Sequence, residues 1–363
     1  MTSLTMTPTC LLHRCALLLA VGMLLSLPAR LAADLVWTPA GGWKIEGGLT
    51  SGLASGDTHR ALTLMNKARV EEEKKHYSFA LRNYKKVTKQ YGNSIYAQEA
   101  FYHTALIRLA RHQYIKAFRA LQEIVSRYPS TPRFNEVIGQ QYRIACDLLD
   151  GARNHGWYFM PGFRNRESSI GLFELVLTNA PYSEYAPLAL MSIAKAHLYL
   201  GEPEESIDAL DRMINTYPKS LLTPDAYLRS AQAHASLVEG PNYDQTSTKE
   251  AITYYEDFVI LYPGDPNIAA AEKGLTDMKQ VLAESKVKLG DYYLKYRRNY
   301  KAAKVFYNEA ITDFPDSPVA VRARKQLTKV DALLAEQDKT VTTGPGGKST
   351  PSKPPKKKRF LFF

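Results

Sequence analysis

Small and large apolar residues recur at fixed spacings along most of this chain, and the clearest copy of the pattern lies between residues 300 and 318. In that copy Ala303, Tyr307, Ala310 and Phe314 follow one another at intervals of four, three and four residues. This spacing places all four side chains on one face of an α-helix. Pro315 follows at once and ends the helix, because proline has no backbone N–H to donate. The stretch therefore predicts an amphipathic helix and then a sharp turn.

The same pattern occurs five more times upstream. Each copy begins with a small residue, has apolar residues at the next two positions of the helical face, and is followed by Pro or Gly and then by a residue suited to cap the next helix. The small residues are Ala80, Ala117, Ser169, Ser206, Ala251 and Ala303; the apolar residues after them are Tyr84, Leu121, Phe173, Leu210, Tyr255 and Tyr307, then Val87, Ile124, Val176, Met213, Phe258 and Ala310; the expected caps are Ser94, Thr131, Ser183, Ser220, Asp265 and Ser317.

These copies predict an all-α fold. A helix–turn–helix unit of about 34 residues, with additions, accounts for intervals of 37, 52, 37, 45 and 52 residues between the small residues. We therefore expect a tetratricopeptide-like α-solenoid of about six helix pairs over residues 57–337, closed by a capping helix at 318–337. The first helix of the sixth pair, from about Asn267 to Arg297, is expected to be nearly twice the usual length.

The N-terminal residues 1–33 have the pattern of a secretory signal peptide. The apolar run Cys15–Leu27 is too short to cross a bilayer comfortably, and small residues at Leu31–Ala33 suit cleavage. An uncleaved N-terminal anchor is the alternative. In a lipoprotein, the lipid-bearing cysteine follows the apolar run. Here Cys10 lies before the run and Cys15 at its start, so lipidation is not expected.

Residues 34–56 contain Trp37, Trp43 and several glycines but few other apolar residues. We expect an extended lead-in that lies along the first repeat. A ligand-binding role for the two tryptophans is the alternative.

An insertion at residues 151–165 separates the two helices of the third pair and holds large apolar residues between glycines. Such residues in a loop either fold back as a plug or stand out and grip a partner. The candidate partner-binding residues are Trp157, Tyr158, Phe159 and Phe163.

The formal net charge of +11 is concentrated at the chain ends, which leaves +3 for residues 34–337. This mixed surface does not favour nucleic acid as a partner. Residues 338–363 form a basic tail that Gly, Pro and like charges keep disordered. The end of the tail either contacts an anionic membrane peripherally or a partner, or is simply solvated; its candidate membrane-contact residues are Lys356, Lys357, Lys358, Arg359, Phe360, Phe362 and Phe363.

No pattern typical of catalysis or metal binding is present. The eight histidines are scattered, and there is no nucleophile elbow, P-loop or dinucleotide fingerprint. Cys146 is interpreted as a small core residue, His197 and His234 as packing residues, and Glu71–Glu73 with the lysines after them as a charged helix face. We predict a protein that is not an enzyme and has no cofactor, metal ion or small-molecule substrate.

One block, residues 260–320, is more specific than a general repeat. It contains Leu261-Tyr-Pro-Gly-Asp-Pro, Lys288-Leu-Gly-Asp-Tyr-Tyr-Leu-Lys, Asn299-Tyr-Lys-Ala-Ala and Phe314-Pro-Asp-Ser-Pro. With its long helix and its turn motif, the block resembles the C-terminal repeats of the BamD-like outer-membrane assembly lipoproteins.

This resemblance implies a non-catalytic scaffold in the periplasm, associated with the outer membrane. It implies docking on a barrel-assembly protein with POTRA-type domains and contact with unfolded outer-membrane protein clients. The chain departs from the family in lacking the lipid-bearing cysteine and in having one repeat more than the usual five. The alternative function is a tetratricopeptide-type coordinator of cell-envelope or cell-division machinery in the periplasm.

Overall fold

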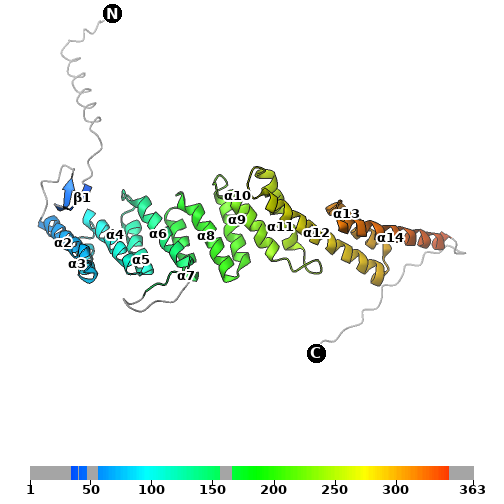
Figure 1. Cartoon of the computed structure of the whole chain (residues 1–363), viewed down its shortest axis with the longest axis horizontal. Helices are drawn as coiled ribbons and strands as arrows, with labels where there is room; N and C mark the ends of the chain where they lie inside the picture. Colours follow the sequence, from blue (N-terminus) through cyan, green and yellow to red (C-terminus); the bar gives the residue numbers. More distant parts are fainter. Residues whose placement is uncertain (1–33, 40, 47–55, 156–165, 343–363) are drawn as a thin grey trace, which may run out of the picture. The chain divides into compact units, whose positions relative to one another are not determined.

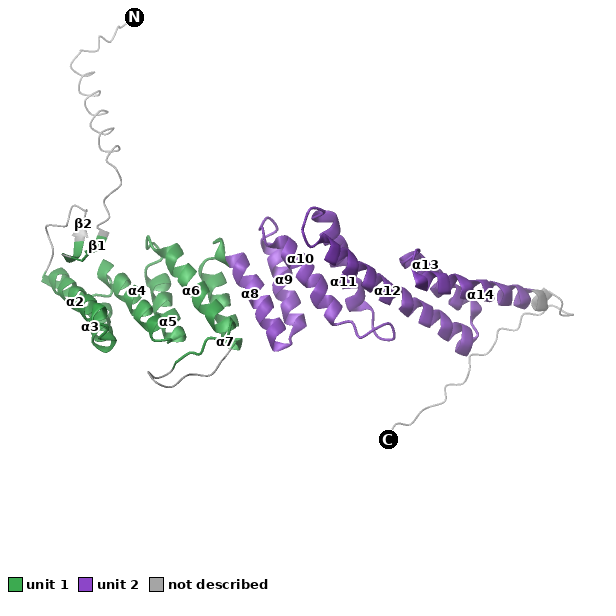
Figure 2. Ribbon diagram, viewed as in Figure 1, with its two compact units in different colours: residues 1–185 green, residues 186–363 purple. Residues whose placement is uncertain are grey.

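The computed structural model describes residues 34–39, 41–46, 56–155 and 166–342. In this part of the chain all regular structure is helical except for one N-terminal β-hairpin (Figure 1). The chain divides into two compact units, residues 1–185 and 186–363 (Figure 2). The described helices α2 to α13 form six consecutive pairs and α14 follows them, so the predicted fold class is confirmed.

Unit 1 contains the hairpin and three helix pairs. Helix α2 packs against α3, α4 against α5 and α6 against α7, and each pair contacts the next through α3–α4 and α5–α6. The elements are β1 (Asp34–Thr38), β2 (Gly42–Glu46), α2 (Gly56–Glu73), α3 (Tyr77–Gln90), α4 (Ile95–Ala110), α5 (Tyr114–Arg127), α6 (Phe134–Leu149) and α7 (Glu167–Asn179).

Unit 2 holds the other three pairs and the closing helix. The predicted long helix is confirmed, because α12 continues directly into a π-helical turn, η1. From α9 to α14 each helix packs against the next. The elements are α8 (Tyr185–Leu200, whose first residue belongs to unit 1), α9 (Pro203–Thr216), α10 (Thr223–Ser236), α11 (Thr246–Leu261), α12 (Ile268–Tyr292), η1 (Tyr293–Arg297), α13 (Tyr300–Asp313) and α14 (Pro318–Thr342).

The repeated residues form the core, as their spacing predicts. In all six copies the small residue and the two apolar residues after it are at most 5% exposed. A helix buries such a stripe because removing apolar surface from water is favourable, and the small residue lets the neighbouring helix come close. The fourth position of the pattern ends the helix: at Tyr91, Tyr128 and Tyr217 the backbone N–H donates to the carbonyl four residues earlier.

The expected helix caps differ from one another in the structure. Ser94 precedes α4 but its side chain makes no capping bond to that helix; its Oγ donates instead to the carbonyl of Tyr91, at the end of the preceding helix. Ser317 donates to the carbonyl of Phe314 and also accepts from the N–H of Ala320 at 3.1 Å. The cap assignment is therefore wrong for Ser94, because the tight turn brings its hydroxyl to an unpaired carbonyl of the helix before it.

The turn inside several helix pairs uses one residue in the left-handed region. Lys75, His112, Gly201 and Arg298 have φ values of 60°, 54°, 78° and 49°. Each stands two residues before the second helix of its pair. Only Gly201 adopts this conformation without a steric penalty from Cβ.

The N-terminal lead-in contains the β-hairpin. Strands β1 and β2 pair antiparallel, with Trp37 opposite Trp43 and Leu35 opposite Ile45. Gly42 has a φ of 67°, and a Cβ there would lie 2.8 Å from Oδ1 of Asn66 on α2. That close approach lets the N–H of Trp43 donate to Asn66 Oδ1 at 2.7 Å, which holds β2 against α2.

Candidate functional site

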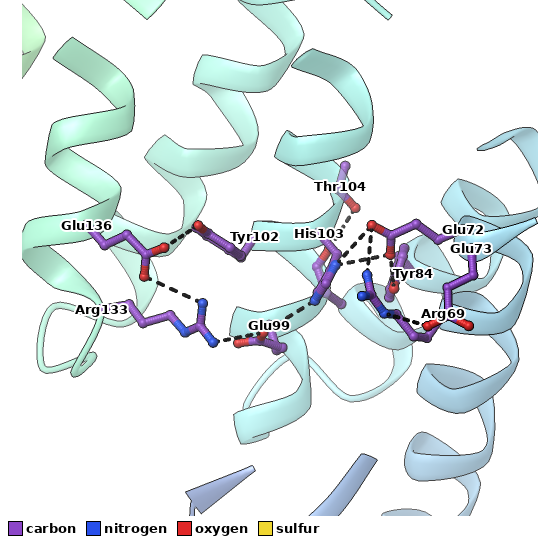
Figure 3. A network of polar contacts seen from close by, with 11 residues as sticks. Arg69, Glu72, Glu73, Tyr84, Glu99, Tyr102, His103, Thr104, Arg133 and Glu136 are labelled. Carbon is purple, nitrogen blue, oxygen red and sulfur yellow. Dashed lines mark hydrogen bonds and ion pairs between the residues drawn. The ribbon is translucent and has the colours of Figure 1, made fainter. Parts of the chain in front are cut away.

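A network of charged and hydroxyl side chains links the first helices of the three pairs in unit 1 (Figure 3). Its members alternate in sign, and successive groups lie within hydrogen-bonding or ion-pairing distance. They include Arg69, Glu72 and Glu73 on α2, Tyr84 on α3, Glu99, Tyr102 and His103 on α4, and Arg133 and Glu136 at the start of α6.

His103 lies at the centre of this network, between two carboxylates. Its Nδ1 lies 3.0 Å from Glu72 Oε2, and its Nε2 lies 3.4 Å from Glu99 Oε1. Glu72 also accepts a hydrogen bond of 2.7 Å from the Tyr84 hydroxyl and pairs with Arg69 Nη1 at 3.2 Å. A ring with a carboxylate at each nitrogen is best satisfied as the imidazolium, which donates from both.

Arg133 continues the network toward α6. Its guanidinium lies 3.4 Å from Glu99 and 3.5 Å from Glu136, and it covers the ring of Tyr102 at 4.9 Å from the ring centre. The Tyr102 hydroxyl donates to Glu136. These contacts tie the start of α6 to the middle of α4.

The pKa shifts in the network agree with this pairing. Burial disfavours a charge on His103, but the hydrogen bonds and charges of Glu72 and Glu99 outweigh burial and raise its pKa. Burial likewise disfavours ionised Glu72, yet His103, Tyr84 and Arg69 together hold its pKa below the ordinary value. Burial and the bond to Glu136 raise the pKa of Tyr102 to about 12, so its hydroxyl stays protonated and donates.

The hairpin covers the network from outside. Trp43, only 4% exposed, meets the His103 ring edge-on at 5.5 Å between ring centres. Trp37 lies under the Arg69 guanidinium at 4.6 Å. Both tryptophans therefore pack the lead-in on the first repeat. The sequence alone leaves ligand binding open as an alternative role for them.

Glu71–Glu73 are interpreted from the sequence as a charged helix face, and the structure shows that the middle residue of this face is largely buried. The side chain of Glu72 is 13% exposed, whereas that of Glu73 is 47% exposed. A signal was available: Met65, Ala68 and Glu72 are spaced three and four residues apart, and the first two are fully buried. Glu72 therefore continues the buried stripe of α2.

The network holds helices together, and its geometry does not favour catalysis. Glu72 and Glu99 both pair with His103, and Trp43 covers the ring that would have to meet a substrate. Among the described residues no group of three or more His, Cys, Asp or Glu side chains is placed to hold a metal ion.

A second candidate site lies on unit 2, at the junction of α12 and η1. We call the exposed residues Leu289, Tyr292 and Tyr296 the tyrosine ridge; they are 42%, 45% and 78% exposed and share one face. The rings of Tyr292 and Tyr296 lie 5.9 Å apart. Exposed tyrosines and their apolar neighbours are typical anchors of protein interfaces.

The tyrosine ridge is surrounded by positive charge. Residues 286–304 contain seven Lys and Arg residues and one acidic residue, Asp291. Three of these cations pair with acidic groups: Lys286 with Glu309, Lys295 with Asp291 and Lys304 with Asp331. The other four are exposed and form no ion pair with any described residue: Lys288, Arg297, Arg298 and Lys301.

The backbone beneath the tyrosine ridge is set by close packing. The hydroxyl of Tyr307 donates to Asp291 at 2.5 Å, and a Cβ at Gly290 would lie 2.7 Å from the Tyr307 ring. Tyr293 stacks on Phe306 at 5.3 Å. These contacts hold η1 in place while its exposed face stays available, and π-helical turns of this kind are frequent at functional sites.

Other predicted residues are placed as follows. His197 pairs with Glu202 at 2.8 Å, and His234 stacks on Tyr254 at 5.3 Å, in agreement with packing roles. Cys146 is half-buried in α6. The signal residues 1–33, the aromatic residues Trp157, Tyr158, Phe159 and Phe163, and the tail residues 356–363 lie outside the described residues. No described helix has the length and apolar character needed to span a membrane.

The paired helices and the buried repeat positions define a tetratricopeptide-like helical repeat protein. Residues 165–343 match the model of a family described as YfiO, outer membrane lipoprotein. Over this part, which includes the tyrosine ridge, the chain is BamD-like.

Curated relatives agree with this match. The chain is 24% identical over 166 residues to the outer membrane protein assembly factor BamD of Rickettsia prowazekii, covering 46% of this chain and 66% of the relative. It is 26% identical over 131 residues to the BamD of Caulobacter vibrioides, covering 36% of this chain and 43% of the relative. The chain thus spans less than two thirds of each of these relatives.

Solved structures include YrrB, described as a TPR protein with an unusual peptide-binding site. The similarity covers 67% of this chain and 97% of that chain, at 13% sequence identity and a TM-score of 0.28. Such a score is too low to relate the two molecules in detail.

Proposed function

We propose that this chain is a non-catalytic scaffold of outer-membrane β-barrel protein assembly, which acts in the periplasm in association with the outer membrane. The observation that supports this proposal most strongly is the match of residues 165–343 to the outer membrane lipoprotein family. The curated relatives in the comparison are outer membrane protein assembly factors by name. A stack of helix pairs suits this role because it offers a rigid surface on which other polypeptides lie.

We assign the docking of the barrel-assembly protein with POTRA-type domains to the tyrosine ridge and its surrounding cations. The ridge lies within the matched segment and offers apolar area from Leu289, Tyr292 and Tyr296. Four exposed cations without an ion pair among the described residues make this surface complementary to an acidic partner surface. The aromatic insertion and the basic tail remain predictions for further partner and membrane contacts.

Co-purification tests the function and the site separately. The mature chain, expressed in its own cells, is expected to recover a barrel-assembly protein with POTRA-type domains. Recovery of peptidoglycan-processing or cell-division factors alone would instead favour the coordinator function and reject this proposal.

The double substitution Arg297→Glu and Arg298→Glu tests the surface. We expect at least about a tenfold loss of the recovered partner, since tenfold in affinity corresponds to about 1.4 kcal/mol. The control is Lys219→Glu with Lys273→Glu, which makes the same change in net charge at exposed positions of unit 2 away from the ridge. Equal recovery by both variants would show that the partner docks elsewhere.

A further inference from the structure

We propose that strand β1 accepts a third β-strand from an unfolded barrel client, whose inward side chain enters the pocket between β1 and helices α4 and α6. This inference rests on the proposed function and adds to it a binding mode for the client. It uses unit 1, whereas the docking surface proposed above lies on unit 2.

The first support is the hydrogen-bond pattern of the hairpin. In an antiparallel pair, residues alternate between positions that bond to the opposite strand and positions whose N–H and C=O point outward. The Trp43 N–H bonds to Asn66 instead of to Trp37, so Trp37 and Trp43 form an outward-pointing pair. By alternation, Leu35 and Ile45 form the next such pair.

The two edges of the hairpin therefore differ. The outward groups of β2 face α2, where Asn66 takes the N–H of Trp43. The outward groups of β1, at Leu35 and Trp37, form no hydrogen bond with any described residue. An edge of this kind is a ready template for another strand, because its donors and acceptors lie at the spacing of a β-ladder.

The second support is a pocket beside this edge. Leu35 is the residue of the hairpin that lines it, together with residues of α4, of α5 and of the segment that leads into α6. Its volume is about 50 Å³, room for one small side chain. Ile95, Ile124 and Val137 make part of its wall apolar, and the Glu99–Arg133 pair supplies polar groups at its side.

The pattern of the hairpin indicates what kind of strand fits. The face that packs on the helices has Leu35, Trp37 and Trp43, and the opposite face has more polar residues such as Thr38 and Lys44. A third strand in the same sheet must repeat this alternation of apolar and polar side chains. The strands of membrane β-barrels have this alternation over their length. Because the proposed function makes unfolded barrel proteins the clients of this chain, we assign the third strand to such a client.

The test uses a short fluorescein-labelled peptide of alternating Val and Thr, and the full mature chain. We expect the peptide to bind, and its analogue with N-methyl groups on alternate amides to lose at least about tenfold in affinity, because it lacks the ladder donors. A control peptide of alternating Ser and Thr is expected to bind at least about tenfold more weakly, since it brings no apolar side chain to the pocket.

Two substitutions in β1 distinguish the contribution of the backbone N–H of Leu35 to peptide binding from that of its side chain. Leu35→Pro removes an outward N–H without removing a bond inside the hairpin, and proline is tolerated at such edge positions. Leu35→Ala removes the side chain but keeps the N–H. We expect Leu35→Pro to lose at least about tenfold in peptide affinity relative to Leu35→Ala.

Hydrogen exchange on the wild-type chain gives an independent result that needs no variant. Peptide binding is expected to slow exchange at the amides of Leu35 and Trp37. Slowing confined to other residues, or equal binding by Leu35→Pro and by the N-methylated peptide, would overturn the edge mechanism. Equal binding of the Ser/Thr peptide would overturn the assignment to barrel clients. The co-purification described above tests the scaffold function independently of these outcomes.

Discussion

Charged residues are used in opposite ways in the two units of this protein. In unit 1, Glu99 and His103 are buried and Glu72 is largely buried; both carboxylates pair with His103, whose ring is covered by Trp43. In unit 2, Lys288, Arg297, Arg298 and Lys301 are exposed and have no ion pair among the described residues. Breaking a buried pair leaves an unsatisfied charge in a poorly solvated place, whereas changing an exposed cation alters mainly what the surface attracts.

This difference separates residues that hold the fold from residues that meet a partner. The polar network of unit 1 fixes how α2, α4 and α6 lie against one another. The tyrosine ridge of unit 2 leaves apolar and charged groups unsatisfied in the chain itself. The four predictions below test this division, in order of decreasing effect.

Glu72→Gln is expected to cause the largest loss of stability. The variant leaves His103 and Arg69 without the carboxylate between them, and we expect the free energy of unfolding to fall by about 2–3 kcal/mol, somewhat below the range for fully buried pairs. Urea unfolding of the mature chain measures this change. The control Glu73→Gln removes only the 3.5 Å ion pair of an exposed carboxylate with Arg69 and should remain within about 0.5 kcal/mol of wild type; similar losses in both variants would contradict the buried network.

Gly290→Ala is expected to destabilise unit 2. Its Cβ would lie 2.7 Å from the Tyr307 ring, which cannot retreat without losing its bond to Asp291. Overpacking of this kind costs about 1–3 kcal/mol. Thermal unfolding followed by circular dichroism measures the loss, and Gly264→Ala, which meets no atom within 4 Å, is the matched control. An unchanged midpoint for Gly290→Ala would show that η1 is not held by this contact.

Two histidines are expected to give the units opposite pH dependence. The pKa of His103 is raised, so the folded state binds more protons, and its stabilising contribution is lost as pH rises above the ordinary value of 6.5 and through the folded pKa. Burial lowers the pKa of His234, although the charges of Glu250 and Asp211 oppose this shift. The folded state therefore binds fewer protons than the unfolded state, and the stability that neutral His234 contributes is lost as pH falls below 6.5.

Urea unfolding from pH 5 to pH 9 measures both slopes. His103→Gln should remove the loss of stability on the alkaline side, and His234→Gln should remove the loss on the acid side. The same slope in His103→Gln and wild type would mean that another group titrates there.

The smallest effect is expected at the turns inside the helix pairs. Lys75 of unit 1 has a φ of 60°, and Gly201 of unit 2 has a φ of 78° at the same place in its pair. Lys75→Gly should raise the free energy of unfolding by about 0.5 kcal/mol. Glycine removes the steric penalty of Cβ at this φ, and the greater conformational entropy of the unfolded chain offsets part of that gain. Gly201→Ala should destabilise by about 1 kcal/mol. Chemical unfolding of the two variants checks these signs, and equal signs would contradict the shared turn geometry.

The sequence was informative about the site in unit 2 and much less so in unit 1. The block that contains Lys288, Gly290 and Tyr292 was recognised as specific from its order of residues, although its role as an exposed surface was not assigned. The network in unit 1 joins Glu72 to His103 across 31 residues of sequence. No local pattern links two such positions, and the acidic neighbours of Glu72 make it resemble the rest of a charged helix face.

The repeated spacing of small and apolar residues determined the helices, their pairing and their buried stripes, because a helix repeats its face every three to four residues and a chain must bury that face. Tertiary structure alone decided which polar groups became buried partners, and it placed the hairpin over His103. The physical reason is that an ion pair or a strand edge depends on which distant segments meet, and local spacing does not encode those meetings.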